Sequence, residues 1–136
     1  MLTNKKVAII GVGKMGGTLV NSMLKNKSVK KENLYGSTAQ EEHAKEINKK
    51  YSIKTYLNNK EMVLGKDIII LAIKPQMMRK VISEIKEVVT EKQLIISIAA
   101  ATSTQFIEEC LGKNIPVIRA MPNTCLLYTS PSPRDS

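Results

Sequence analysis

A short apolar run that leads directly into a glycine-rich turn constrains the fold of this chain more than any other feature. The run is Val7 to Ile10, and the turn has the pattern Gly11-x-Gly13-x-x-Gly16. Apolar residues near helical spacing follow it: Met15, Leu19, Val20, Met23 and Leu24. A strand, a glycine turn and a helix in this order predict a dinucleotide-binding unit.

Each glycine of this turn has a physical reason to be there. Gly11 permits the tight turn, Gly13 lets a pyrophosphate approach the backbone, and Gly16 lets the helix pack closely on the strand. The pyrophosphate would then lie at the positive end of the helix dipole. The expected cofactor loop is the whole turn: Gly11, Val12, Gly13, Lys14, Met15 and Gly16. The alternative is a glycine turn that binds no ligand.

Strand-like and helix-like segments alternate along the chain as far as residue 121. The expected strands are 5–10, 33–37, 52–55, 67–73, 93–98 and 115–119. The expected helices are 14–26, 39–50, 59–64, 76–89 and 103–111, the last with a capping box of Thr102 and Gln105. The strands 67–73 and 93–98 are almost continuously apolar, which is typical of parallel strands covered on both faces. The pattern predicts an α/β fold, a doubly wound parallel sheet of the Rossmann type, in one domain over residues 1–124.

This alternation stops after Thr124. Residues 125–136 contain two prolines and three serines and continue no strand or helix pattern. Cys125 to Ser130 resembles the translation of a transposase-type sequencing adaptor, TGT CTC TTA TAC ACA TCT. We expect residues 125–136 to be a non-native tail and the natural chain to continue differently, the alternative being a genuine disordered tail.

The composition is that of a globular domain with an excess of positive charge. The net charge is +9, but the lysines are dispersed and mixed with glutamates, which argues against a nucleic-acid partner. No apolar run approaches the ~20 residues that span a bilayer, so we expect no membrane association and a cytoplasmic location. Two cysteines make no metal-ligand or disulfide pattern, and His43 is expected to be a solvated surface residue.

Ser37 and Thr38 end the second expected strand, at the sheet edge where nucleotides bind in this architecture. Folds selective for NAD place an Asp or Glu there, whereas neutral hydroxyls would not repel a 2′-phosphate. The pair therefore favours NADP, with NAD as the alternative.

At the end of the fourth strand, Pro75 suits the first turn of a helix. Lys74 would lie near the phosphates or the nicotinamide ribose, the alternative being that it is simply solvated.

Four motifs together resemble pyrroline-5-carboxylate reductase. They are Gly11-Val-Gly-Lys-Met-Gly16, Ala72-Ile-Lys-Pro75, Ser97-Ile-Ala-Ala100 and Ile118-Arg-Ala-Met-Pro-Asn-Thr124. The similarity covers residues 5–124, essentially the family's N-terminal cofactor domain. Two departures are Ala101, where the family usually has Gly, and Cys125, where it has Pro.

This resemblance implies hydride transfer from NADPH to 1-pyrroline-5-carboxylate, a small-molecule substrate, giving L-proline in the last step of proline biosynthesis. It places Ser37 and Thr38 at the 2′-phosphate and Asn59 against the cofactor. It also implies contacts with ribose and nicotinamide from Ala72, Ile73, Lys74, Pro75 and Ala100, with Asn123 bordering the same crevice. No residue is a convincing catalytic acid or base, which suits an already activated iminium.

The family's helical C-terminal domain, which forms its homo-oligomer and much of its substrate pocket, is missing from this sequence. We therefore expect the fragment to be inactive alone. Two alternatives remain. One is another NADP-dependent imine or hydroxyacid oxidoreductase, and the other is a non-enzymatic nucleotide-binding domain.

Overall fold

The computed structural model describes residues 4–99 and 102–120. Its strands are β1 (Val7–Ile10), β2 (Leu34–Ser37), β3 (Lys54–Tyr56), β4 (Ile68–Leu71), β5 (Leu94–Ser97) and β6 (Val117–Arg119). Its helices are α1 (Lys14–Lys25), α2 (Glu41–Tyr51), α3 (Asn59–Val63), α4 (Pro75–Ile85) and α5 (Thr104–Leu111), with a 3-10 turn at Lys31–Asn33. Every strand and helix predicted from the sequence is present in these residues.

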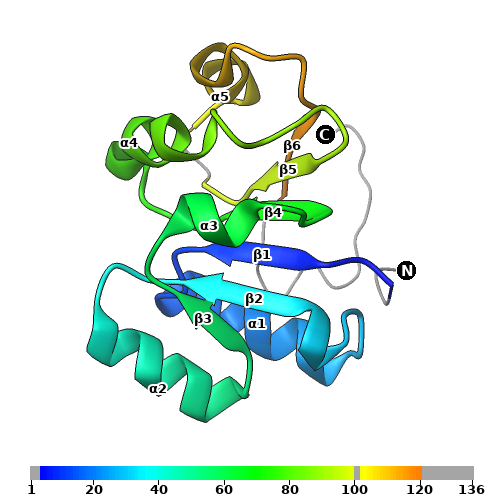
Figure 1. Ribbon diagram of the computed structural model, residues 1–136, viewed down its shortest axis with the longest axis vertical. Coiled ribbons are helices and arrows are strands. Elements are labelled where there is room, and N and C mark those ends of the chain that lie inside the picture. The colour runs from blue at the N-terminus through cyan, green and yellow to red at the C-terminus, as the bar shows by residue number, and fades with distance from the viewer. Residues whose placement is uncertain (1–3, 100–101, 121–136) are drawn as a thin grey trace.

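The six strands form one parallel sheet in the order β3-β2-β1-β4-β5-β6 (Figure 1). Strand β1 lies between β2 and β4, so that Val7 is level with Leu34 on one side and Ile68 on the other. The order reverses at β1, because the chain first builds outward to β3 and then returns to add β4 on the opposite side. Such a switch point opens a crevice at the carboxyl ends of the strands, and it confirms the predicted doubly wound fold.

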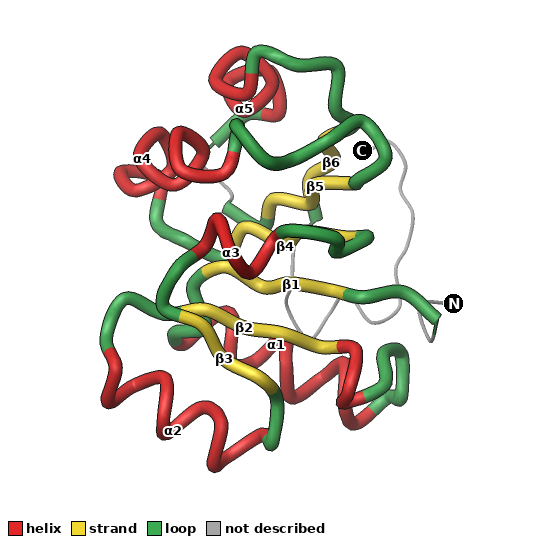
Figure 2. Tube along the Cα trace, viewed as in Figure 1, coloured by secondary structure: helices red, strands yellow, loops and turns green. Residues whose placement is uncertain are grey.

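Two hydrophobic cores lie on opposite faces of this sheet. Val7 and Ile9 of β1 pack in the core that contains Val20 of α1 and Ile47 of α2. The alternate residues of β1 pack in a second core with the helices α3, α4 and α5. Figure 2 shows the yellow sheet with red helices on its two sides. Continuous apolar runs thus give strands that are buried on both faces.

The helix α4 illustrates how the sequence specifies a helix. Pro75 occupies its first turn, as predicted, where a missing N–H costs nothing. Its buried residues recur at helical spacing and face the sheet: Met78, Val81, Ile82 and Ile85. The helix ends four residues before the predicted limit of 89, and the Val88 and Val89 amides donate instead to the carbonyl of Ile85.

The predicted capping box at the start of α5 was wrong by one residue. The N-cap is Ser103, whose Oγ accepts a hydrogen bond from the amide of Phe106 at 3.1 Å. Thr102 is buried and precedes the cap, and Gln105 is one position too early to close a box. A serine and a threonine in succession offer two equivalent caps to sequence reasoning, and packing selects between them.

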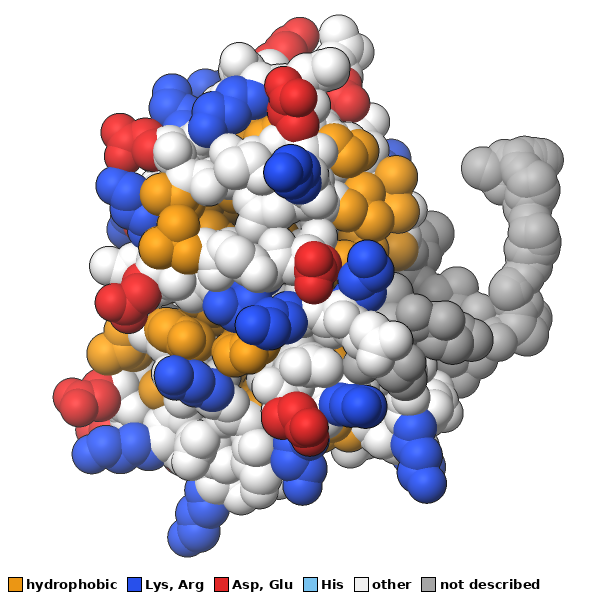
Figure 3. All heavy atoms as spheres, turned by 45° about the vertical axis from the view of Figure 1, so that its right-hand side comes forward, with side chains coloured by type: hydrophobic (Ala, Val, Ile, Leu, Met, Phe, Trp, Pro, Cys, Tyr) orange, Lys and Arg blue, Asp and Glu red, His pale blue; other side chains and the backbone are white. Residues whose placement is uncertain are grey.

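Lysine side chains lie over the aromatic rings of β2 and of the edge strand β3. The rings of Tyr35 and Tyr56 lie 6.4 Å apart, and the Lys66 ammonium sits 4.4 Å from the centre of the Tyr35 ring. Partial burial lowers the pKa of Lys66, and the nearby charges of Lys6 and Lys54 lower it further. On the face of the molecule shown in Figure 3, basic side chains are scattered among acidic and apolar ones. Within the described ranges, no helix is long and apolar enough to cross a membrane.

Candidate functional site: a nucleotide crevice at the carboxyl edge of the sheet

The glycine loop connects β1 to α1 with the geometry that the sequence predicts. Gly11 has φ +89°, and a Cβ there would lie 2.8 Å from the carbonyl oxygen of Ala72. A Cβ on Gly16 would lie 2.5 Å from the carbonyl oxygen of Gly11. Both positions therefore require glycine, the first for its turn and the second for the close packing of helix on loop.

Gly13 differs from its two neighbours because a Cβ there would meet no described atom within 4 Å. The residue is the N-cap of α1 and has no side chain to accept from the helix's first amides. The first-turn N–H groups of a helix lack intrahelical acceptors, and they carry the positive end of its dipole. Open space beside these donors fits a pyrophosphate, and Lys14 and Met15 contribute their backbone to the same turn.

The end of β2 is tied directly to this loop. The amides of Gly11 and Val12 donate to the carbonyl oxygen of Ser37 at 3.1 and 2.9 Å. The Ser37 hydroxyl also accepts from the Gly11 amide at 3.4 Å. Ser37 is only 2% exposed and Val12 is equally buried, so Val12 offers a ligand its backbone alone. The two strands thereby hold the loop in one conformation.

Asn59 links the same corner of the site to α4. The Ser37 hydroxyl donates to Asn59 Oδ1 at 2.6 Å, and Asn59 Nδ2 donates to Glu84 Oε1 at 3.0 Å. One residue further on, Lys60 donates to Glu87 at 2.7 Å and lowers the pKa of its carboxyl. A hollow of about 400 Å³ lies between α3 and α4, and its lining includes Asn59, Glu84 and Glu87.

Thr38 has a partner that the sequence did not predict. Its Oγ1 lies 3.0 Å from Nδ1 of His43, in the first turn of α2. Thr38 and His43 are both half-buried, so the expectation of a solvated His43 was wrong. The chain turns back on itself between β2 and α2, which brings together two side chains that are five positions apart.

The loop after β4 forms the other wall of the crevice. The Ala72 amide donates to the carbonyl of Ile10 at 2.9 Å, which holds this loop beside the glycine turn. Ile73 packs against Gly11, since a Cβ on that glycine would meet its Cγ2 at 2.6 Å. Lys74 is exposed at the N-cap of α4, before Pro75. Of the remaining predicted site residues, Ala100 and Asn123 lie outside the described residues, as does the predicted tail 125–136.

The structure therefore brings together three of the predicted segments: the glycine loop, the end of β2 with Asn59, and the end of β4. Sequence reasoning did not find Glu84 or His43. Both are half-buried residues of polar helix faces, where a charged or polar residue is usually only solvated. Within the described residues, no cluster of three His, Cys, Asp or Glu side chains could hold a metal ion.

Residues 6–101 match a protein family described as NADP oxidoreductase coenzyme F420-dependent. The chain belongs to this family. It is also 37% identical, over 122 residues and 90% of its length, to the pyrroline-5-carboxylate reductase of Methanosarcina acetivorans. It spans 45% of that relative's length, so the similarity concerns one half of the enzyme.

Two solved structures support the same relationship. The pyrroline-5-carboxylate reductase of Coxiella burnetii matches with a TM-score of 0.82 and 30% identity, over 88% of this chain and 44% of that one. The Plasmodium falciparum pyrroline carboxylate reductase, solved with NADP bound, matches with a TM-score of 0.77 and 29% identity. That match covers 91% of this chain and 45% of the Plasmodium chain.

Proposed function

We propose that this chain is the cofactor-binding part of an NADPH-dependent pyrroline-5-carboxylate reductase. Such an enzyme transfers hydride to the imine carbon of 1-pyrroline-5-carboxylate and forms L-proline. The observation that carries the proposal is the 37% identity to one such reductase over 90% of this chain. A glycine loop with open space at Gly13 and an uncapped helix end supports it, because these features fit a pyrophosphate.

The cofactor would be held by three parts of the crevice. The first-turn amides of α1 would bind the pyrophosphate, Ser37 and Thr38 would lie at the 2′-phosphate, and Asn59 would contact the adenosine end. Ala72, Ile73 and Lys74 would lie beside the ribose and nicotinamide, with Ala100 and Asn123 completing that wall. Bound NADPH would supply the hydride, while the protein positions it and excludes competing reactions.

We propose that much of the substrate pocket, and the contacts between copies of the enzyme, lie in the part of the relatives that this chain does not span. Hydride transfer needs the substrate held at near-attack distance, and such positioning supplies much of the rate. We therefore propose that the 136-residue chain alone does not turn over pyrroline-5-carboxylate. The longer enzyme would act in the cytoplasm as a homo-oligomer.

Activity of the longer gene product tests this function. We expect oxidation of NADPH that depends on 1-pyrroline-5-carboxylate. The reaction is measured as the loss of absorbance at the nicotinamide band. Absence of this reaction, with turnover of another imine or of a hydroxyacid instead, would favour a different oxidoreductase. Binding of DNA or RNA at about 150 mM salt without any NADPH binding would favour the nucleic-acid reading of the +9 charge.

Cofactor choice is tested at Ser37. We expect NADPH to bind more tightly than NADH, and Ser37→Asp to reverse this order by placing a carboxylate near the ribose. Ser37→Ala is the matched control, since it removes the hydroxyl without adding charge. Equal affinities for the two cofactors, unchanged by Ser37→Asp, would show that this corner does not select. Because Ser37 is buried, both variants need a check of folding by circular dichroism.

A further inference from the structure

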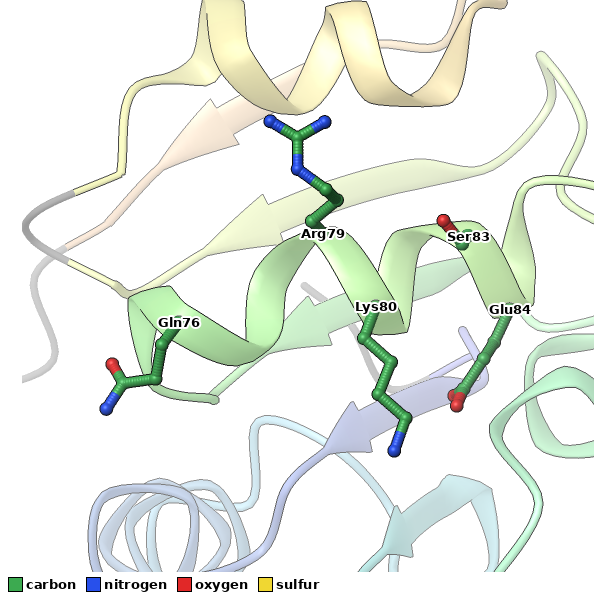
Figure 4. A pocket seen from close by; sticks show the side chains of 5 residues that line it. All are labelled: Gln76, Arg79, Lys80, Ser83 and Glu84. Atoms are coloured by element: carbon green, nitrogen blue, oxygen red, sulfur yellow. The ribbon is translucent and has the colours of Figure 1, made fainter.

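A chain of three hydrogen bonds runs from the glycine loop to α4. The Gly11 amide donates to Ser37 Oγ, the Ser37 hydroxyl donates to Asn59 Oδ1, and Asn59 Nδ2 donates to Glu84 Oε1. Figure 4 shows Glu84 and Lys80 on the side of α4 that faces away from α5, whereas Arg79 points toward α5. Residues from four separate elements thus meet in one network, next to the loop that would bind the pyrophosphate.

Glu84, the last member of this network, fixes the direction of the hydrogen bond between Ser37 and Asn59. A serine hydroxyl both donates and accepts, and an asparagine amide can present either its oxygen or its nitrogen to a given side. A carboxylate only accepts, so Glu84 requires Nδ2 of Asn59 on its side. Asn59 Oδ1 then faces Ser37, which must use its single proton there and keep its lone pairs for the Gly11 amide.

Asn59 is consequently held from two sides. The hydrogen bond of 2.6 Å ties it to β2, and the hydrogen bond of 3.0 Å ties it to α4. The backbone of α3 has independent anchors, because Asn58 caps the helix and Lys60 pairs with Glu87. Removal of Glu84 should therefore free the Asn59 amide without releasing the helix that carries it.

We propose that Glu84 is a positioning residue for the cofactor site, which holds the Asn59 amide in one orientation and thereby directs the hydrogen bond that the Ser37 hydroxyl donates. This inference rests on the proposed function, in which Asn59 contacts the adenosine end of NADPH. A pre-organised amide binds without first losing its rotational freedom, so Glu84 raises NADPH affinity although its carboxylate carries the same sign of charge as the ligand.

Three variants of the full chain test the proposal. Glu84→Ala removes the acceptor, Glu84→Gln keeps an acceptor oxygen without the charge, and Glu87→Ala is the matched control. Glu87 lies three residues further on, in the turn just after α4, and also accepts from α3, but from Lys60 rather than from Asn59. The loss of negative charge is equal in all three variants.

We expect Glu84→Ala to weaken NADPH binding about three- to tenfold, which corresponds to the loss of one ordinary hydrogen bond. Glu84→Gln and Glu87→Ala should stay within about twofold of the wild-type affinity. Equal affinities for Glu84→Ala and Glu87→Ala would overturn the proposal. Tighter binding by Glu84→Ala would show a repulsive role and overturn it too, as would a Glu84→Gln protein as weak as Glu84→Ala.

A second measurement separates this inference from the proposed function. The side-chain amide resonances of Asn59, followed by NMR without any cofactor, should shift in Glu84→Ala and stay in place in Glu87→Ala. A wild-type chain that binds no NADPH would refute the proposed function, yet this spectrum would still test the role of Glu84. Asn59 resonances that coincide in Glu84→Ala and wild type would refute that role.

Discussion

Strands β1 and β4 are buried on both faces, whereas β5 and β6 are buried on only one. All four residues of β1 and of β4 are buried. In β5, buried Ile95 and Ser97 alternate with half-buried Leu94 and Ile96. On the same side of the sheet as those two, Ile118 of β6 is 48% exposed. Among the described residues, Ile118 belongs to neither hydrophobic core.

This difference shows where the proposed site gets its rigidity. The glycine loop and the loop after β4 both leave strands that are fixed by packing on each face, and they are hydrogen-bonded to each other through Ala72 and Ile10. Sites built on such a scaffold hold their geometry better than sites on loose loops. The apolar sequence of β5, in contrast, suits a strand covered on both faces, yet Leu94 and Ile96 on its outer face are only half-buried.

We expect the largest loss of stability from a cavity at a strand that is buried on both faces of the sheet. Ile69 of β4 is fully buried, and Ile69→Ala should lower the free energy of unfolding by about 2–5 kcal/mol. Ile96→Ala, on the half-covered face of β5, should cost only about 1 kcal/mol because less area returns to water. Urea denaturation of the two variants measures both values. Equal losses would remove the contrast between the two halves.

Substitutions in the glycine loop should have the next largest effect on stability. Two of its glycines separate the role of packing from the role of ligand binding. Gly16→Ala forces a methyl group against the Gly11 carbonyl and should cost about 1–3 kcal/mol of stability. Gly13→Ala enters open space, so it should unfold like the wild type but weaken NADPH binding about tenfold. Thermal unfolding and cofactor titration distinguish the pair. A Gly13→Ala chain with unchanged affinity would argue against a pyrophosphate at this turn.

A smaller effect is expected at the junction of β2 and α2. His43→Ala removes the ring nitrogen that lies 3.0 Å from the Thr38 hydroxyl, and it should cost about 0.5–1.5 kcal/mol of stability. If Thr38 contacts the 2′-phosphate, the released hydroxyl should also lower the preference for NADPH over NADH. His43→Asn is the control, since its amide can still reach a neighbouring hydroxyl. Unfolding curves that superimpose on the wild type would show that this contact contributes nothing.

The sequence was a good guide to the backbone and a poor one to side-chain networks. Apolar periodicity and glycine placement predicted every described strand and helix, because those patterns record which faces are buried. The bonds from Asn59 to Ser37 and to Glu84 join residues 22 and 25 positions apart. Such contacts depend on how α3 sits against β2 and α4, and no local pattern encodes that placement.

The smallest effect on stability should come from the exposed apolar face itself. Ile118 is 48% exposed, so Ile118→Ser removes little buried area and should change the free energy of unfolding by less than about 0.5 kcal/mol.

The Ile118→Ser substitution should instead affect association between molecules, because an exposed apolar patch promotes such contacts. We expect the wild-type chain to show a concentration-dependent rise in apparent mass by light scattering, and the Ile118→Ser chain to show less of it. Lys92→Ser, which replaces an exposed lysine shortly before β5, is the control for a general change of surface. If Ile118→Ser unfolds the chain instead, β6 is packed on both faces and the contrast with β4 disappears.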